Sequence, residues 1–163
     1  MEAGEKEQLA EAVYALHQDG ALRIIKTTPV ARPAKKVRIP GKTSWGSVII
    51  SCASATGIES VASGAGVYPA VCTINPDALG GKSLMVRSRL PGDRLQPYGM
   101  KGTKKVQDIF VDAKVPEHLR DAVPLVVCGE EVVWIPGYRI ATRFSVGGKH
   151  AKSLRVEATR EKE

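Results

Sequence analysis

One short loop, Gly99-Met100-Lys101-Gly102, carries the residue types that could hold a phosphate group. Glycine lets a backbone approach a ligand closely, because no Cβ shields its N–H group. Thr103 can cap a helix that the apolar spacing extends to about Ala113, so the positive end of that helix would face the loop. Three lysines surround the loop: Lys101, Lys104 and Lys105. The segment predicts an anion-binding site, with a solvated turn leading into an ordinary helix as the alternative.

Motifs of catalysis are absent around this loop. Its glycines do not have the spacing of a nucleotide-hydrolysing P-loop, and Ser63-Gly64-Ala65-Gly66 lacks the third glycine of a dinucleotide site. Three nearby carboxylates could serve a metal-dependent nuclease: Asp93, Asp108 and Asp112. Each has basic neighbours, so charge balance is the favoured interpretation. The sequence predicts no catalytic residue.

The cysteines and histidines do not form a metal-binding pattern. Cys52, Cys72 and Cys128 contain no C-x-x-C pair, and the three histidines are scattered. An odd number of unpaired cysteines is typical of reduced, buried thiols in a cytoplasmic protein. We therefore expect no metal site.

Positive charge recurs along the chain, whose formal net charge is +7. Residues 1–20 are acidic, but residues 21–58 carry seven basic residues and no acidic one. Residues 82–120 carry nine basic against four acidic residues, and residues 134–156 carry five against none. Such a distribution predicts a positive face, for which nucleic acid is the usual partner. A surface that is basic only for solubility is the alternative.

Strand patterns dominate the elements that must position this block. Apolar residues at Leu9, Ala12, Val13 and Leu16 predict a helix over residues 5–17, which Asp19-Gly20 ends. Pro116 begins a second short helix, and two apolar runs around Gly129-Glu130 predict a hairpin. The fold class expected is α+β, mainly antiparallel strands with two or three short helices. No apolar run is long enough to span a bilayer, so we expect no membrane partner.

One continuous motif resembles a known family. The pattern R-S-R-x-P-G-D-R-x-x-P-x-G-x-x-G-x-K-K-x-x-D-x-F-x-D-x-K-V-P runs from Arg87 to Pro116, and V-W-x-x-G-x-R-I runs from Val133 to Ile140. Together they resemble the C-terminal domain of the tRNA(Ile)-lysidine synthetases, the TilS family. The resemblance covers residues 84–146 well and residues 36–83 only loosely. It implies three parts: an N-terminal helix (1–20), a variable β-rich region (21–83) and a tRNA-binding domain (84–160).

The resemblance also implies a partner and a division of labour. Family members use ATP and Mg²⁺ in an N-type ATP pyrophosphatase domain to join lysine to the wobble cytidine of an isoleucine tRNA, and their C-terminal domain grips the tRNA acceptor stem. The S-G-G-x-D-S loop of that catalytic domain does not occur in this sequence, so we expect this chain to hold no cofactor itself. The residues expected to contact tRNA phosphates are Arg87, Arg89, Arg94, Lys101, Gly102, Lys104, Lys105, Arg139 and Arg143.

Two other functions stay open. The chain could be a structural domain that docks a catalytic partner, with its basic face serving solubility only. A small nuclease using the three carboxylates is the least favoured alternative.

Overall fold

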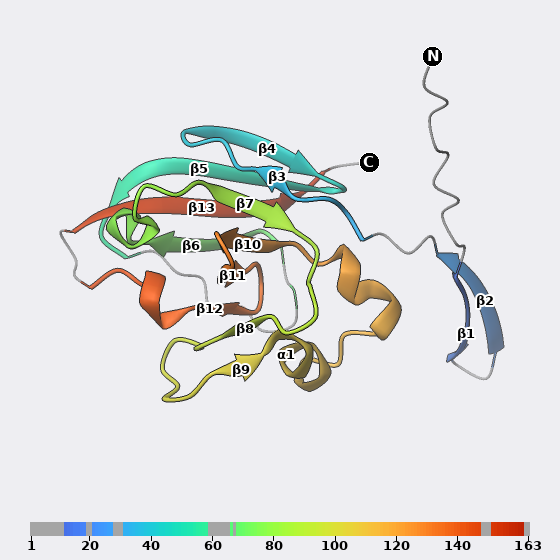
Figure 1. The fold of residues 1–163 in the computed structure, drawn as a ribbon. Coiled ribbons are helices and arrows are strands. Elements are labelled where there is room, and N and C mark those ends of the chain that lie inside the picture. Colours follow the sequence, from blue (N-terminus) through green and yellow to red (C-terminus); the bar gives the residue numbers. More distant parts are fainter. Residues whose placement is uncertain are drawn as a thin grey trace, which may run out of the picture.

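Two antiparallel sheets packed face to face form the body of the protein, as seen in the computed structural model (Figure 1). Because β-strands expose side chains alternately on two faces, each sheet can turn one apolar face inward. The structure describes residues 12–18, 21–27, 31–58, 66, 68–147 and 151–161.

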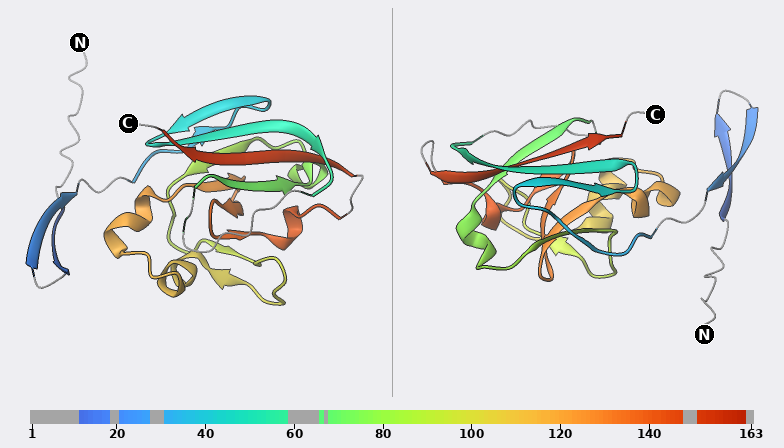
Figure 2. Two further views of the ribbon diagram at one scale, coloured as in Figure 1. Left: turned by 180° about the vertical axis from the view of Figure 1, so that it is seen from behind. Right: turned by 90° about the horizontal axis from the view of Figure 1, so that it is seen from above.

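The first sheet has the order β4-β5-β13-β6. Its strands are β4 (Gly41–Trp45), β5 (Val48–Thr56), β6 (Ala70–Ile74) and β13 (Lys152–Arg160). Burial alternates along much of β5 and β13, as expected for strands with one face in the core. The late strand β13 lies between β5 and β6, which Figure 2 shows from behind.

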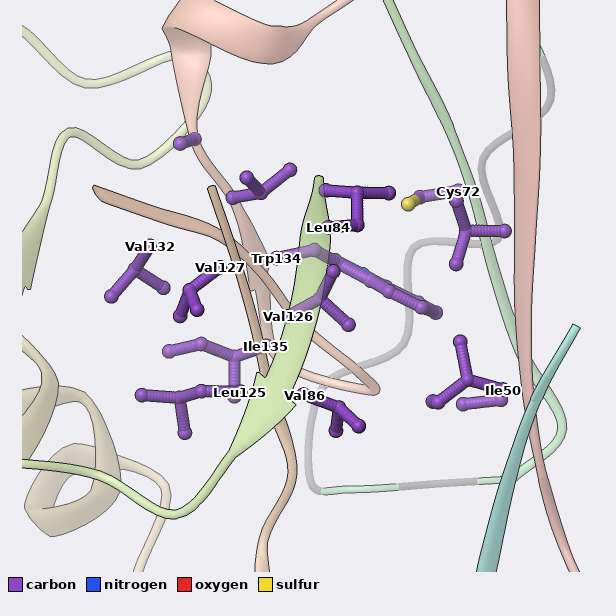
Figure 3. Packing of buried hydrophobic residues seen from close by; sticks show 14 of the residues in the cluster. Ile50, Cys72, Leu84, Val86, Leu125, Val126, Val127, Val132, Trp134 and Ile135 are labelled. Atoms are coloured by element: carbon purple, nitrogen blue, oxygen red, sulfur yellow. The ribbon is translucent and has the colours of Figure 1, made fainter. Parts of the chain in front are cut away.

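The second sheet has the order β12-β11-β10-β7-β3. Its strands are β3 (Lys35–Lys36), β7 (Leu84–Arg87), β10 (Leu125–Cys128), β11 (Glu131–Ile135) and β12 (Arg139–Ile140). Every residue of β10 is buried, because this strand is central in its sheet. Trp134 reaches from this sheet toward Ile50 and Cys72 of the other sheet (Figure 3). Residues on both sides of position 84 therefore contribute to one continuous core.

A two-stranded sheet and short helices complete the fold. They are η1 (Pro76–Leu79), β8 (Arg94–Leu95), β9 (Lys104–Lys105), α1 (Val106–Asp112), η2 (Glu117–Ala122) and η3 (Thr142–Phe144). Val106, Ile109 and Phe110 bury the apolar face of α1, as the spacing predicted. The ring of Phe110 meets Tyr138 edge to face, with 5.7 Å between centroids. Among the described residues, none of the helices is long and apolar enough to cross a membrane.

The predicted fold class is confirmed, but one predicted helix is wrong in type and another is wrong in its starting residue. Residues of the expected helix 5–17 instead form strand β1 (Ala12–Gln18), which pairs with β2 (Ala21–Thr27); residues 1–11 lie outside the described part. The two strands are separated only by Asp19-Gly20, a dipeptide that favours hairpin turns as well as helix ends. Helix α1 begins at Val106 and not at Thr103, because Lys104 and Lys105 pair with Leu95 and Arg94 as strand β9.

Candidate functional site

A buried ion pair holds the turn at Leu90–Asp93. The Arg87 guanidinium donates to both carboxylate oxygens of Asp93, at 2.7 and 2.9 Å, and the two side chains are only 10% and 9% exposed. The same carboxylate accepts a bond from the Leu90 N–H at 2.7 Å, so it cannot serve freely as a base. Arg87 was predicted to contact a phosphate; the structure pairs its guanidinium with Asp93, where it fixes the turn.

A second, more open ion pair ties the same segment to η2. Arg89 Nε donates to an oxygen of Asp121 at 3.0 Å. The neighbouring Ser88 hydroxyl donates to the Asp121 carbonyl at 2.6 Å. Arg89 thus has a carboxylate partner already, although 23% of its side chain is still accessible.

Two further predicted cations also have carboxylate partners. Lys104 is paired with Asp112 at the end of α1, and Arg143 is paired with Glu131 of β11. The hydrogen bond from Arg143 to Glu131 raises the pKa of that guanidinium. Arg143 also lies over the ring of Phe144, at 5.4 Å from the centroid. An incoming phosphate would have to compete with these carboxylates.

Arg94 and Lys105 form a different arrangement, a cross-strand pair of like charges. They are directly opposite each other in the β8–β9 ladder, so their side chains share one face, and both are exposed. Their strand neighbours Leu95 and Lys104 occupy the other face, where Leu95 is buried. Neither cation has an ion-pair partner within the described ranges. Like charges placed directly opposite destabilise a strand pair, so this pairing does not benefit the fold.

Lys105 is unfavourable for the stability of the fold in a second way. It is the N-cap residue of α1, where a carboxylate would be favourable and a cation is not. Arg94 and Lys105 are thus two neighbouring cations that destabilise the local structure. An external anion, such as a phosphate, would neutralise them.

The glycine loop is exposed to solvent, but the N-terminus of α1 does not point toward it. Lys101 and Gly102 are exposed, and nothing lies within 4 Å of where a Cβ on Gly99 or Gly102 would stand. The first N–H of α1, that of Val106, donates to the Asp93 carbonyl at 3.0 Å instead of facing the loop. The predicted contribution of a helix dipole at this loop is therefore wrong, since the intervening residues form β9.

A groove of about 430 Å³ lies between the Arg87–Asp93 turn and η2. Its lining includes Arg89, Lys105 and Arg120 together with the carboxylates of Glu117 and Asp121. Arg120 was not among the predicted contacts, and only the packing of η2 against the turn brings it there. Its Nε donates to the Val115 carbonyl at 3.0 Å, which orients the side chain.

The remaining predicted contact, Arg139, lies on β12 beside the glycine loop. It is exposed, and its guanidinium donates to the Tyr138 carbonyl at 3.0 Å. The loop joins this strand through the bond from the Tyr98 N–H to the Ile140 carbonyl, 2.9 Å. Four of the predicted cations are therefore exposed and have no carboxylate partner in the part of the chain that the structure describes. They are Arg94, Lys101, Lys105 and Arg139.

The cysteines take no part in this surface. Burial raises the pKa of Cys52 to about 11 and that of Cys72 well above its ordinary value, so both stay protonated thiols at neutral pH. Among the described residues, no cluster of histidine, cysteine and carboxylate side chains could hold a metal ion.

Comparison with known proteins identifies the segment that carries this surface. Residues 84–157 match the family model described as the TilS substrate C-terminal domain. This segment belongs to the TilS C-terminal domain family. The tRNA(Ile)-lysidine synthase of Clostridium tetani is 47% identical over 81 residues, which is 50% of this chain and 17% of that protein. The synthase of Symbiobacterium thermophilum is 51% identical over 80 residues, 49% of this chain and 17% of that protein. The matched region is therefore 17% of the length of either curated relative.

A solved structure extends the likeness beyond the TilS motif. The crystal structure of a TilS C-terminal domain superposes with a TM-score of 0.68 at 22% identity, covering 80% of this chain and 98% of that one. At this identity the likeness shows the fold. It includes a large share of the chain outside residues 84–157, in agreement with the shared core.

Proposed function

We propose that this domain binds tRNA through the surface formed by the β8–β9 ladder and the adjoining loop. The observation that carries the proposal is the exposed Arg94–Lys105 pair, two cations without a carboxylate partner among the described residues, within a TilS C-terminal domain. Phosphates of a nucleic-acid backbone would neutralise both charges and release condensed counterions. In our proposal the exposed Lys101 and Arg139 add two further phosphate contacts.

The relatives, which are named tRNA(Ile)-lysidine synthases, suggest which tRNA the domain binds and which reaction it serves. In our proposal the domain grips the acceptor stem of an isoleucine tRNA in the cytoplasm. A catalytic N-type ATP pyrophosphatase domain would use ATP and Mg²⁺ to join lysine to the wobble cytidine. The surface described above would supply binding and no catalytic group, and it would hold neither cofactor itself.

A salt titration of tRNA binding tests this proposal. The double variant Arg94→Ala with Lys105→Ala should bind tRNA more weakly and lower the slope of log K against log salt concentration by about 2. The matched control is Lys42→Ala with Lys152→Ala, which removes the same charge from exposed positions in the four-stranded sheet. Equal slopes for the wild type and the Arg94/Lys105 variant, or an equal loss in the control, would refute the proposal.

A further inference from the structure

Tyr98 is an aromatic side chain that the core does not use. It is 65% exposed, whereas the other aromatic side chains that the structure describes are buried or half-buried. Met100, two residues later, is 48% exposed. Exposing these two apolar side chains together on one loop brings the fold no packing energy.

The turn that carries Tyr98 is held firmly. The Met100 N–H donates to the Pro97 carbonyl at 3.0 Å, and Gly99 has φ +84°, the conformation that the third position of such a turn requires. The Gln96 side chain donates to the Met100 carbonyl at 3.0 Å. An aromatic ring on a fixed turn loses little conformational entropy when it binds a flat partner.

The turn is also fastened to the segment after β12. The Thr142 N–H donates to the Gln96 carbonyl at 2.9 Å, and the Thr142 hydroxyl donates to the Gln96 and Pro97 carbonyls, each at 3.2 Å. Together with the bond from the Tyr98 N–H to the Ile140 carbonyl, these contacts hold the backbone of the turn beside β12, the strand that carries Arg139.

Two exposed cations without carboxylate partners in the described structure belong to the segments that this turn joins. Lys101 follows Met100 in the chain, and Arg139 lies next to Ile140. Since both are exposed, a strand of nucleic acid could place its phosphates on them and a base on the ring. A protein partner with an acidic segment would use the charges, but it would not need a flat aromatic surface.

We propose that Tyr98 is a stacking platform for an unpaired RNA base, with Lys101 and Arg139 holding the phosphates beside it. This inference rests on the proposed tRNA binding and adds a single-stranded part to the RNA that the domain recognises. Aromatic rings stack on unstacked bases whatever their identity, whereas bases within a duplex are not accessible to them.

Two RNA probes test this inference with the full chain: a hairpin duplex with a four-nucleotide unpaired 3′ extension, and the same duplex with a blunt end. The wild type should bind the extended RNA about 5- to 150-fold more tightly, the range that one stacked base contributes. Tyr98→Ala should bind the extended RNA no better than the blunt one, whereas Tyr98→Phe and Tyr98→Trp should keep the preference. The fluorescence of 2-aminopurine placed in the extension should be quenched by the wild type and not by Tyr98→Ala.

The controls separate this inference from the proposed function. The Arg94/Lys105 double variant should weaken both RNAs by the same factor and keep the preference for the extension. Blunt RNA bound as tightly as extended RNA would overturn the stacking platform and leave tRNA binding in place. Failure to bind either RNA would overturn both. Equal losses for both RNAs in Tyr98→Ala, or unchanged quenching, would also overturn the platform.

Discussion

Two charged pairs on one stretch of chain use arginine in opposite ways. Arg87 is buried against Asp93 and satisfies a turn, while Arg94 is exposed beside Lys105 with no carboxylate partner in the described structure. Both arginines belong to the same sequence motif and were expected to share one role. The comparison teaches that a motif of basic residues contains fold-stabilising and ligand-facing members. The partner of each side chain tells them apart.

The same distinction divides the remaining predicted cations. Arg89, Lys104 and Arg143 each have a carboxylate, but their pairs are more exposed than that of Arg87 and Asp93. Exposed pairs contribute little to stability. Such residues can still add to a general positive potential, but they should contribute less to binding than the unpaired cations.

The largest expected effect concerns the buried pair. Arg87→Ala leaves the Asp93 carboxylate buried without its partner, so the free energy of unfolding should fall by about 3 kcal/mol. Urea denaturation measures this change. The matched control is Arg89→Ala, which breaks a more exposed pair and should cost no more than about 1 kcal/mol. Equal losses in the two variants would remove the distinction between buried and exposed pairs.

A charge reversal at Lys105 should separate stability from binding. In Lys105→Glu the new carboxylate would attract the Arg94 guanidinium across the ladder, and it would also suit the N-cap of α1. The free energy of unfolding should therefore rise by about 0.5 kcal/mol. Binding of tRNA should weaken at the same time, as a filter-binding titration would show. A variant that is both less stable and unchanged in binding would contradict our account of this ladder.

The smallest expected difference lies between two adjacent lysines. Lys105→Ala should lower the salt slope of tRNA binding by about 1, because a phosphate contact of this ammonium releases about one counterion condensed on the RNA. Lys104→Ala should lower it by less, since the Lys104 ammonium already has Asp112 as its partner. A larger effect for Lys104 would show that its ion pair opens when RNA binds.

Local patterns predicted those elements whose signals are local. The hairpin of β10 and β11, the start of η2 after Pro116 and the buried face of α1 follow from turn residues and periodicity. The start of α1 was predicted wrongly because the pairing of Lys105 with Arg94 is a tertiary contact that overrides the capping signal at Thr103.

The site was predictable as a segment but not residue by residue. Basic residues around glycines indicate anion binding, yet their sequence does not say which of them a carboxylate neutralises. Asp121 reaches Arg89 only because η2 packs beside the turn. Tyr98 was missed because its exposure becomes visible only once the Pro97–Met100 turn is formed. An aromatic residue within a Pro-x-Gly turn is the signal that could have found it.

The place of β13 in its sheet has a consequence for how the domain tolerates truncation. Residues 152–160 pair with β5 along one edge and with β6 along the other. A chain cut before Lys152 would lose both ladders at once and leave two unpaired strand edges, each a template for aggregation. In the described part of the sheet, β5 and β6 are hydrogen-bonded to β13 and not to each other, and β13 is made long after both. Until β13 has been synthesised, the β4–β5 ladder and β6 therefore have no shared strand to join them into one sheet.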